Sequence, residues 1–260
     1  MSDGAAGKTA VITGGAGGLG RALADALKAD GWHCALIDLP GDALNNAAKD
    51  DPAVTAYPCD VTDAGAVAEV CRQITADRPS VDLVIYAAGI THIGLFAESD
   101  PTVHQRVMDI NYMGTVHVVA GLLEPVRAAK GTHLALSSVA GFAPLIKRTA
   151  YAASKHAVEG FFKTLRSEEK PYGVKVLIAA PSFVATNVGA DDAKDGTARP
   201  GSAKDSLDIM SADEAARIIL SGYKKGRAFI PVGRVARLSY WLCRLFPGLY
   251  TRLMERRIRP

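Results

Sequence analysis

Tyr151 and Lys155 are the residues whose types and spacing point most directly to proton-transfer chemistry. They lie four residues apart in Ala150–Thr164, a run with helix-compatible spacing, so both side chains are predicted on one face of a helix. A tyrosine near its ordinary pKa of about 10 is mostly protonated at neutral pH and is a poor base. A lysine ammonium beside it, and the positive ring of an oxidised nicotinamide, would stabilise the phenolate and lower that pKa. Taken alone, such a pair is common and usually structural.

A glycine-rich stretch near the N-terminus is predicted to hold phosphate groups. Thr13–Gly20 follows an apolar run at Thr9–Ile12 and opens into a helix-like pattern at Arg21–Lys28. A strand, a glycine turn and a helix start in this order can cradle a dinucleotide pyrophosphate, because glycines let the backbone approach phosphates and the helix N-terminus offers free N–H groups. Glycines also mark plain turns, so the motif depends on its context.

Asp38 supplies part of that context. It ends the next apolar run, Cys34–Ile37, and lies 20 residues past Gly18, where a carboxylate can accept hydrogen bonds from an adenosine ribose. An acid at this place repels a 2′-phosphate, so the sequence favours NAD over NADP. The alternative is a solvated turn residue ahead of Pro40.

Composition and length favour one α/β domain in a reducing compartment. The chain has 260 residues, 48% of them apolar, and can bury one large core. Four cysteines form no C-x-x-C pair and no secretory signal precedes Lys8, so we expect a cytoplasmic protein. The six histidines form no metal-binding motif, and no metal is expected.

Seven apolar, strand-like runs alternate with segments long enough for helices. The alternation predicts a single Rossmann-type domain, with a doubly wound parallel sheet and helices on both faces. Ligands of such sheets bind beyond the carboxyl ends of the strands, so the residues after each run are the candidate site. The predicted strands are Thr9–Ile12, Cys34–Ile37, Val54–Tyr57, Leu83–Tyr86, His133–Leu136, Val174–Ala179 and Ala228–Ile230.

Six short motifs follow one another along most of the chain. They are Thr13–Gly20, Cys59–Thr62, Ala87–Gly89, Asp109–Gly114, Ser138–Gly141 and Tyr151–Lys155. In these motifs and their order the chain resembles the short-chain dehydrogenase/reductase family. The resemblance implies a catalytic set of Asn111, Ser138, Tyr151 and Lys155, with the family's common spacing of 13 residues from serine to tyrosine.

The resemblance also implies a role for each member of the set. Tyr151 exchanges a proton with the substrate oxygen, Ser138 holds that oxygen by a hydrogen bond, and Asn111 binds a water that links Lys155 to solvent. Without the resemblance, Asn111 would be interpreted as a helix kink or a turn residue, and Ser138 as a cap of the turn before Gly141. The cofactor contacts implied are Gly14, Gly18, Leu19, Gly20, Asp38, Asp60, Val61, Ala88, Gly89, Tyr151, Lys155, Pro181, Val184 and Thr186.

Two positions depart from the family pattern. Ala87 stands where the family often has an asparagine that steadies the sheet end, so another group must satisfy those backbone bonds. Ser182 replaces the usual glycine after Pro181, and it needs a compatible backbone angle if the turn is retained. Neither change removes a reacting group.

The predicted reaction is hydride transfer between NAD(H) and a secondary alcohol or ketone. Ser138, Tyr151, Phe142 and Phe183 are the predicted substrate contacts, and their apolar surroundings favour a bulky steroid-, retinoid- or aromatic-type alcohol. Residues 187–211 have little apolar periodicity and are predicted to form a lid loop over the site, the alternative being an insertion without a role in selectivity. The other hypotheses are an NADPH-dependent ketone reductase and a catalytically idle dinucleotide sensor or membrane-surface scaffold.

The segment from Gly226 to Pro260 is strongly basic. It has eight arginines, no lysine and one acid, Glu255, so it carries +7 of a chain whose formal net charge is +3 and leaves −4 for the other 225 residues. Pro247-Gly248 separates two helix-like stretches. The apolar residues that recur at helical spacing, or lie beside them, are Val235, Leu238, Trp241, Leu242, Leu245, Phe246 and Tyr250.

This pattern predicts a C-terminal helical extension over 231–260, beyond a dinucleotide-binding and catalytic domain over 1–230. Residues 234–260 suit an amphipathic helix on an anionic membrane surface, and they are too short and too charged to span a bilayer. The competing interpretation is a helix that covers the substrate pocket or packs on a second subunit. By resemblance we expect a homodimer or homotetramer. Nucleic-acid binding is not expected, because the basic segment lacks a recognised reading module.

Overall fold

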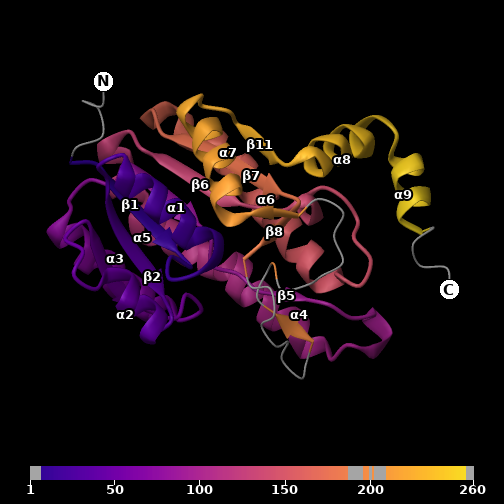
Figure 1. Ribbon diagram of the computed structural model, residues 1–260, viewed down its shortest axis with the longest axis horizontal. Helices are drawn as coiled ribbons and strands as arrows, with labels where there is room; N and C mark the ends of the chain where they lie inside the picture. The colour runs from indigo at the N-terminus through magenta and orange to yellow at the C-terminus, as the bar shows by residue number, and fades with distance from the viewer. Residues whose placement is uncertain (1–6, 187–195, 199–200, 202–208, 256–260) are drawn as a thin grey trace.

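A seven-stranded parallel sheet forms the centre of the fold. The computed structural model describes residues 7–186, 196–198, 201 and 209–255. The strands run in the order β11-β7-β6-β4-β1-β2-β3, and every neighbouring pair is parallel (Figure 1). They are β1 (Thr9–Thr13), β2 (His33–Asp38), β3 (Val54–Pro58), β4 (Leu83–Tyr86), β6 (Thr132–Leu136), β7 (Lys175–Pro181) and β11 (Phe229–Val232). The predicted sheet is confirmed, each predicted strand lying within two residues of its observed bounds.

Alternate residues of the strands face two opposite layers of helices. On β1, Ile12 packs in one apolar cluster with Leu23, whereas Val11 packs in a second cluster with Leu122. Burial on both faces explains why most residues of these strands are apolar. The first layer contains α1 (Gly18–Ala29), α2 (Asp42–Ala48) and α7 (Ala212–Lys224), and the second contains α3 (Ala64–Asp77), α5 (Gly114–Ala129) and α6 (Thr149–Glu169).

The strand order reverses beside β1. The chain moves outward from β1 to β2 and β3, then crosses back to place β4 on the other side of β1. The loops that follow β1 and β4 therefore separate at the carboxyl edge and leave a crevice between them, which is where ligands of open α/β sheets bind. The topology thus places the glycine-rich loop at the predicted edge.

Two small sheets lie outside the central one. β5 (Thr91–His92) pairs antiparallel with β9 (Thr197–Ala198), and β10 (Ile209–Ser211) pairs parallel with β8 (Phe183–Ala185). Both involve parts of the predicted lid at 187–211. The rest of that lid, 187–195, 199–200 and 202–208, lies outside the described residues, so the lid hypothesis stays a prediction.

The chain leaves the sheet through two C-terminal helices. α8 (Arg234–Leu245) follows β11 directly and α9 (Pro247–Glu255) follows α8, and Figure 1 shows both at the end of the molecule, in yellow. The predicted pair of helices separated at Pro247 is confirmed. Among residues 7–186 and 209–255, no helix is long and apolar enough to cross a lipid bilayer.

Candidate active site

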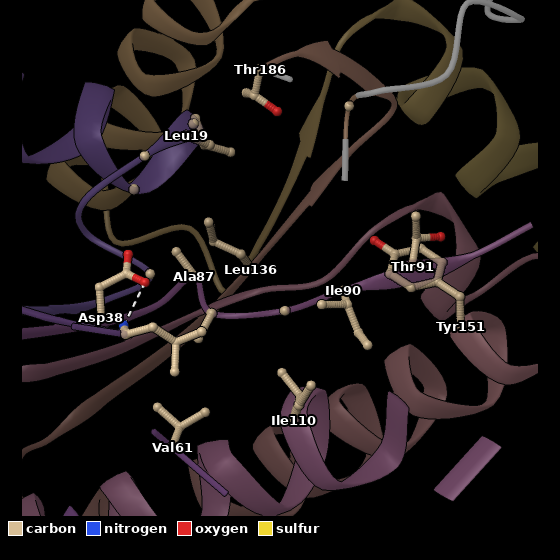
Figure 2. Close-up of a pocket in the computed structure, with 18 of the residues that line it drawn as sticks. Leu19, Asp38, Val61, Ala87, Ile90, Thr91, Ile110, Leu136, Tyr151 and Thr186 are labelled. Carbon is tan, nitrogen blue, oxygen red and sulfur yellow. Dashed lines mark hydrogen bonds between the residues drawn. The ribbon is translucent and has the colours of Figure 1, made fainter. Parts of the chain in front are cut away.

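A cavity of about 1090 Å³ opens at the carboxyl ends of the strands (Figure 2). Its walls come from the loops after β1, β2, β3, β4, β6 and β7. Every predicted cofactor contact lines it, from Gly14 in the first loop to Thr186 after β8. Ser138 and Phe183 line it as well, whereas Asn111 and Phe142 do not. The structure therefore brings residues far apart in the sequence to one cavity.

The loop after β1 adopts a backbone conformation that only glycine can take at several positions. Gly14 has a φ of +67°, and a Cβ there would lie 2.8 Å from the Ala88 nitrogen. Gly18 has a φ of +55°, and a Cβ on Gly20 would collide with the carbonyl oxygen of Gly14. These close approaches require residues without side chains.

The same loop delivers the open N-terminus of a helix to the cavity. Gly17 caps α1 without any side-chain hydrogen bond, a Cβ there would meet nothing within 4 Å, and the first turn of α1 contains no acid. The first N–H groups of a helix lack intrahelical partners and attract negative charge. The loop and helix end therefore fit the pyrophosphate of a dinucleotide.

Asp38 ends β2 beside this loop. One carboxylate oxygen accepts a hydrogen bond of 2.9 Å from the Ala16 N–H, and the other accepts one of 2.8 Å from the Leu39 N–H. Asp38 also lines the cavity, as Figure 2 shows. It is thus more than a solvated turn residue, because it joins the glycine loop to the end of β2 while its negative charge borders the cavity.

Thr13 binds the backbone N–H groups at positions 87 and 88, and position 87 is where the family often has an asparagine. Its hydroxyl accepts hydrogen bonds from the Ala87 N–H at 3.1 Å and the Ala88 N–H at 3.2 Å. The Thr13 carbonyl also accepts from the Ala87 N–H. The group that must compensate for alanine at position 87 is therefore the last residue of β1.

Lys155 is buried on α6, and burial lowers its pKa to about 8. Its Nζ donates a hydrogen bond of 2.8 Å to the backbone carbonyl of Leu136, at the end of β6. The same atom lies 5.7 Å from the centre of the Tyr151 ring. Lys155 thus fixes α6 to the strand that leads into Ser138.

Tyr151 has a pKa set by opposing causes. Burial raises it above the ordinary value, whereas a hydrogen bond with Ser138 and the positive charge of Arg148 lower it. Arg148 is a cation that acts on the phenol here, while the Lys155 amine donates to the Leu136 carbonyl. That Lys155 and a bound nicotinamide together lower the Tyr151 pKa stays a prediction. Arg148 is held in turn by a hydrogen bond of 2.8 Å to the Thr91 hydroxyl.

Ser138 has a structural contact in addition to its contact with Tyr151. Its hydroxyl accepts a hydrogen bond of 3.2 Å from the Ala140 N–H and caps the short 3-10 turn Val139–Gly141. The capping interpretation is therefore confirmed, and the same oxygen faces the cavity beside the Tyr151 hydroxyl. The turn holds Ser138 in a fixed orientation.

Asn111 lies in a π-helical turn, Asp109–Met113, between α4 (Pro101–Met108) and α5. Its side-chain oxygen accepts from the Ile90 N–H at 2.8 Å, and its amide donates to the Ile90 carbonyl and to the Ser154 hydroxyl, both at 2.9 Å. Ser154 donates at 2.8 Å to the Tyr151 carbonyl. Asn111 therefore lies in an irregular turn of the helix, and its buried side chain joins the loop after β4 to α6. A water at this residue remains a prediction.

Phe142 and Ser182 have roles in packing. Phe142 packs edge-on against Phe229 and Tyr240, with ring centres 5.9 and 5.4 Å apart, and so points toward the C-terminal helices. Ser182 donates its N–H to the Val232 carbonyl at 3.1 Å, and its φ is not positive, so the turn after β7 does not require glycine.

Four groups that hold or influence the candidate site were not predicted from the sequence. Thr13 accepts hydrogen bonds from backbone N–H groups, and Leu136 accepts one with its backbone carbonyl. The residue types alone do not indicate either contact. Arg148 and Ser154 each lie three residues from Tyr151, a spacing that places them on its side of the helix and could have identified them.

The sequence matches known proteins of one family. The sequence model of the family described as short chain dehydrogenase matches residues 8–196. A relative from Bos taurus, "Dehydrogenase/reductase SDR family member 7B", is 34% identical over 265 residues, covering 96% of this chain and 81% of the relative. The protein of the same name from Mus musculus is 30% identical over 262 residues, covering 96% and 80%.

Solved structures share the fold. A short chain dehydrogenase from Burkholderia cenocepacia J2315 in complex with NADP aligns with a TM-score of 0.81 at 21% identity, covering 98% of this chain and 99% of that one. A short chain dehydrogenase/reductase from Burkholderia phymatum in complex with NAD aligns at 0.76 with 23% identity, covering 86% and 88%. These neighbours bind one or the other nicotinamide dinucleotide in the same fold.

Proposed function

Because the chain belongs to the short-chain dehydrogenase/reductase family of oxidoreductases, we propose that it transfers a hydride between a nicotinamide dinucleotide and a secondary alcohol or ketone. The observation that carries this proposal is the meeting of Ser138, Tyr151 and Lys155 in one cavity with the glycine loop. A protein that only binds a dinucleotide does not need the Tyr151 phenol beside the Ser138 hydroxyl and the Arg148 cation. The idle-sensor alternative is therefore the weaker one.

The dinucleotide is assigned to the side of the cavity nearest α1. Gly14, Gly18, Leu19 and Gly20 would hold its pyrophosphate, and the loops after the other strands would hold the rest. When bound, a nicotinamide dinucleotide accepts or supplies the hydride. The Asp38 carboxylate would accept the ribose hydroxyls and repel a 2′-phosphate, so we assign NAD rather than NADP.

Tyr151 is assigned the proton transfer. During oxidation its phenolate would take the hydroxyl proton of the substrate, and during reduction the phenol would protonate the developing alkoxide. The Ser138 hydroxyl would donate a hydrogen bond to the same oxygen, which strengthens as negative charge develops there. Arg148 favours the phenolate form, as the direction of its effect on the Tyr151 pKa shows.

Lys155 and Asn111 hold the reacting groups in place. Lys155 fixes α6 against β6 through the Leu136 carbonyl, and Asn111 fixes α6 against the loop after β4 through Ser154 and Ile90. We propose that a water at Asn111 connects the Lys155 amine to solvent, so that a proton removed by Tyr151 can leave the site.

The substrate is proposed to be a bulky apolar secondary alcohol or ketone. Phe183 and Leu145 line the cavity near Ser138 and Tyr151 and supply an apolar wall. Phe142 is not included in this assignment, since it packs against Phe229 and Tyr240. Alcohols of the steroid, retinoid or aromatic type fit such a wall better than sugar phosphates do.

A substrate panel tests the proposal. The purified protein is mixed with NAD or NADP and a series of secondary alcohols, from small aliphatic to aromatic and steroid compounds, and the absorbance of the reduced nicotinamide is followed. We expect turnover with NAD that increases with the apolar bulk of the alcohol. Turnover with NADP alone would instead support the NADPH-linked reductase, and dinucleotide binding without turnover of any alcohol or ketone would support the sensor.

A further inference from the structure

The outer face of α8 is apolar and uncovered. Leu238, Trp241 and Leu245 follow one another at three- and four-residue spacing, so they share one side of the helix. Their exposed fractions are 68%, 60% and 63%. Three large apolar side chains exposed together on successive turns form a patch of the kind that marks an interaction surface.

The inner face of α8 is already occupied by the body of the protein. Ala236 and Ser239 are buried, and the Tyr240 ring stacks on Phe229 with centres 4.5 Å apart. Tyr240 also meets Phe142, and Leu242 joins the same apolar cluster. Of the apolar residues predicted on these helices, Leu242 and Tyr250 pack within the subunit, and packing on a second subunit stays a prediction. The other predicted residues remain on the outside.

α9 extends the same kind of surface. Phe246, between the two helices, is 59% exposed, and Leu249 and Leu253, one helical turn apart on α9, are 49% and 43% exposed. Tyr250 points inward and is buried in the cluster with Phe142. Both helices thus pack on the protein with one face and leave large apolar residues of the other face in solvent.

The charged residues of these helices are almost all positive. Arg234, Arg237, Arg244 and Arg252 are exposed on α8 and α9, and Glu255 is the one acid between Gly226 and Pro260. Arg237 and Arg244 lie seven residues apart, so they share one flank of the apolar stripe of α8. An apolar stripe bordered by arginines matches a surface that has an apolar interior and negative headgroups.

We propose that the outer face of α8 and α9 docks on the surface of an anionic phospholipid membrane. Leu238, Trp241 and Leu245 enter the boundary between headgroups and acyl chains, and the flanking arginines contact lipid phosphates. The indole of Trp241 suits this boundary, because it is apolar with one polar N–H. The proposal concerns a surface of the fold and does not depend on the proposed reaction.

A second copy of the chain is the less favourable occupant. A two-fold interface pairs a patch with itself, so it would bring the arginines of one protomer toward those of its partner. Like charges in that arrangement oppose association, whereas anionic lipid complements them. Charge complementarity therefore favours the lipid.

Vesicle flotation of the full chain tests the proposal. Vesicles of phosphatidylcholine alone are compared with vesicles that also contain phosphatidylserine. One variant, Leu238→Ser with Trp241→Ser, removes the apolar contact, and a second, Arg237→Gln with Arg244→Gln, removes two charges. The matched controls are Phe96→Ser, an exposed apolar residue elsewhere, and Arg72→Gln on α3. Circular dichroism and sedimentation of each variant without lipid report folding and subunit number.

We expect the chain to float with the phosphatidylserine vesicles and not with phosphatidylcholine alone. Each arginine removed should weaken partitioning about fivefold, so the double arginine variant should lose roughly 25-fold, and added salt should act in the same direction. The double apolar variant should lose at least as much, and both controls should float like the parent. No flotation with the phosphatidylserine vesicles, or flotation that is unchanged in a folded double variant, would overturn the proposal. A drop in subunit number caused by the apolar variant without lipid would assign the face to a second copy instead.

Discussion

The Nζ of Lys155 and the backbone carbonyl of Leu136 are 2.8 Å apart, in a buried hydrogen bond that joins α6 to the end of β6. Leu136 lies two residues before Ser138, and Lys155 lies one helical turn after Tyr151. The bond therefore fixes the distance between the two elements that present the hydroxyl and the phenol. It also buries an amine, which has a measurable consequence for stability.

The Lys155→Met variant should show a pH-dependent difference in stability from the parent. Burial lowers the Lys155 pKa from 10.5 to about 8, so between these pH values the unfolded chain binds a proton that the folded chain does not. The free energy of unfolding of the parent, relative to that of the variant, should therefore rise with pH through this window by roughly 3 kcal/mol. Below about pH 8 the difference should be constant. Urea unfolding at a series of pH values measures it.

Subtracting the free energy of unfolding of the variant from that of the parent removes the contributions of other groups that titrate at alkaline pH. Examples are the buried Cys34 and Cys71, whose pKa values burial raises to about 12. Lys175→Met, at an exposed lysine on β7, is the matched control and should give a flat difference. A flat difference for Lys155→Met as well would mean that the buried amine keeps its ordinary pKa.

The Arg148→Gln variant should move the pH profile of alcohol oxidation to higher pH. Arg148 lowers the Tyr151 pKa, so its removal makes the phenolate form only at higher pH. The measurement is kcat against pH with saturating cofactor and alcohol, and the alkaline rise reports the phenol. Arg148→Lys keeps the charge and should stay close to the parent. An unshifted pH profile for Arg148→Gln would show that Arg148 does not lower the Tyr151 pKa.

The Asp38→Asn variant should relax the preference for NAD over NADP. An amide oxygen can still accept the hydrogen bond from the Ala16 N–H, so the loop is retained while the negative charge is lost. A unit charge at about 4 Å contributes about 1–4 kcal/mol, so the ratio of kcat/KM values should move toward NADP by roughly tenfold or more. Asp50→Asn, at an exposed acid away from the cavity, should leave the ratio unchanged. No movement in Asp38→Asn would withdraw the assignment of NAD.

The Thr13→Val variant should destabilise the fold at the mouth of the cavity. Valine has nearly the same shape but cannot accept from the Ala87 and Ala88 N–H groups. The Ala87 N–H keeps the Thr13 carbonyl as an acceptor, whereas the Ala88 N–H loses the Thr13 hydroxyl. This one unsatisfied donor should lower the free energy of unfolding by about 1–3 kcal/mol. Thr13→Ser retains the hydroxyl and should lose less. A loss in Thr13→Ser without a loss in Thr13→Val would show that the methyl group, and not the hydroxyl, is what matters.

The sequence predicted the sheet because its strands are buried on both faces. Runs such as Ala10–Ile12 are apolar without interruption, and the helical segments between them leave little choice of topology. The residues that line the cavity were predictable for a related reason, since parallel strands bring the residues that follow them to one edge.

The parts of the site that escaped prediction depend on orientation and on backbone atoms. Phe142 follows Ser138 by four residues, but the turn Val139–Gly141 directs it toward Tyr240 and away from the cavity. The Leu136 carbonyl attracts the Lys155 amine, and no residue type marks such an acceptor. The sequence also could not show which apolar residues of α8 are buried and which are exposed, because that depends on how the helix packs against β11.

Proton transfer by Tyr151 is the central claim, and the Tyr151→Phe variant tests it most directly. The measurement is kcat for the best alcohol of the panel with saturating NAD, beside the affinity for NADH by fluorescence, so that lost chemistry is separated from lost binding. The account predicts a fall in kcat of about 10²–10⁴-fold with the dinucleotide still bound. A variant that keeps the parent's kcat would contradict it.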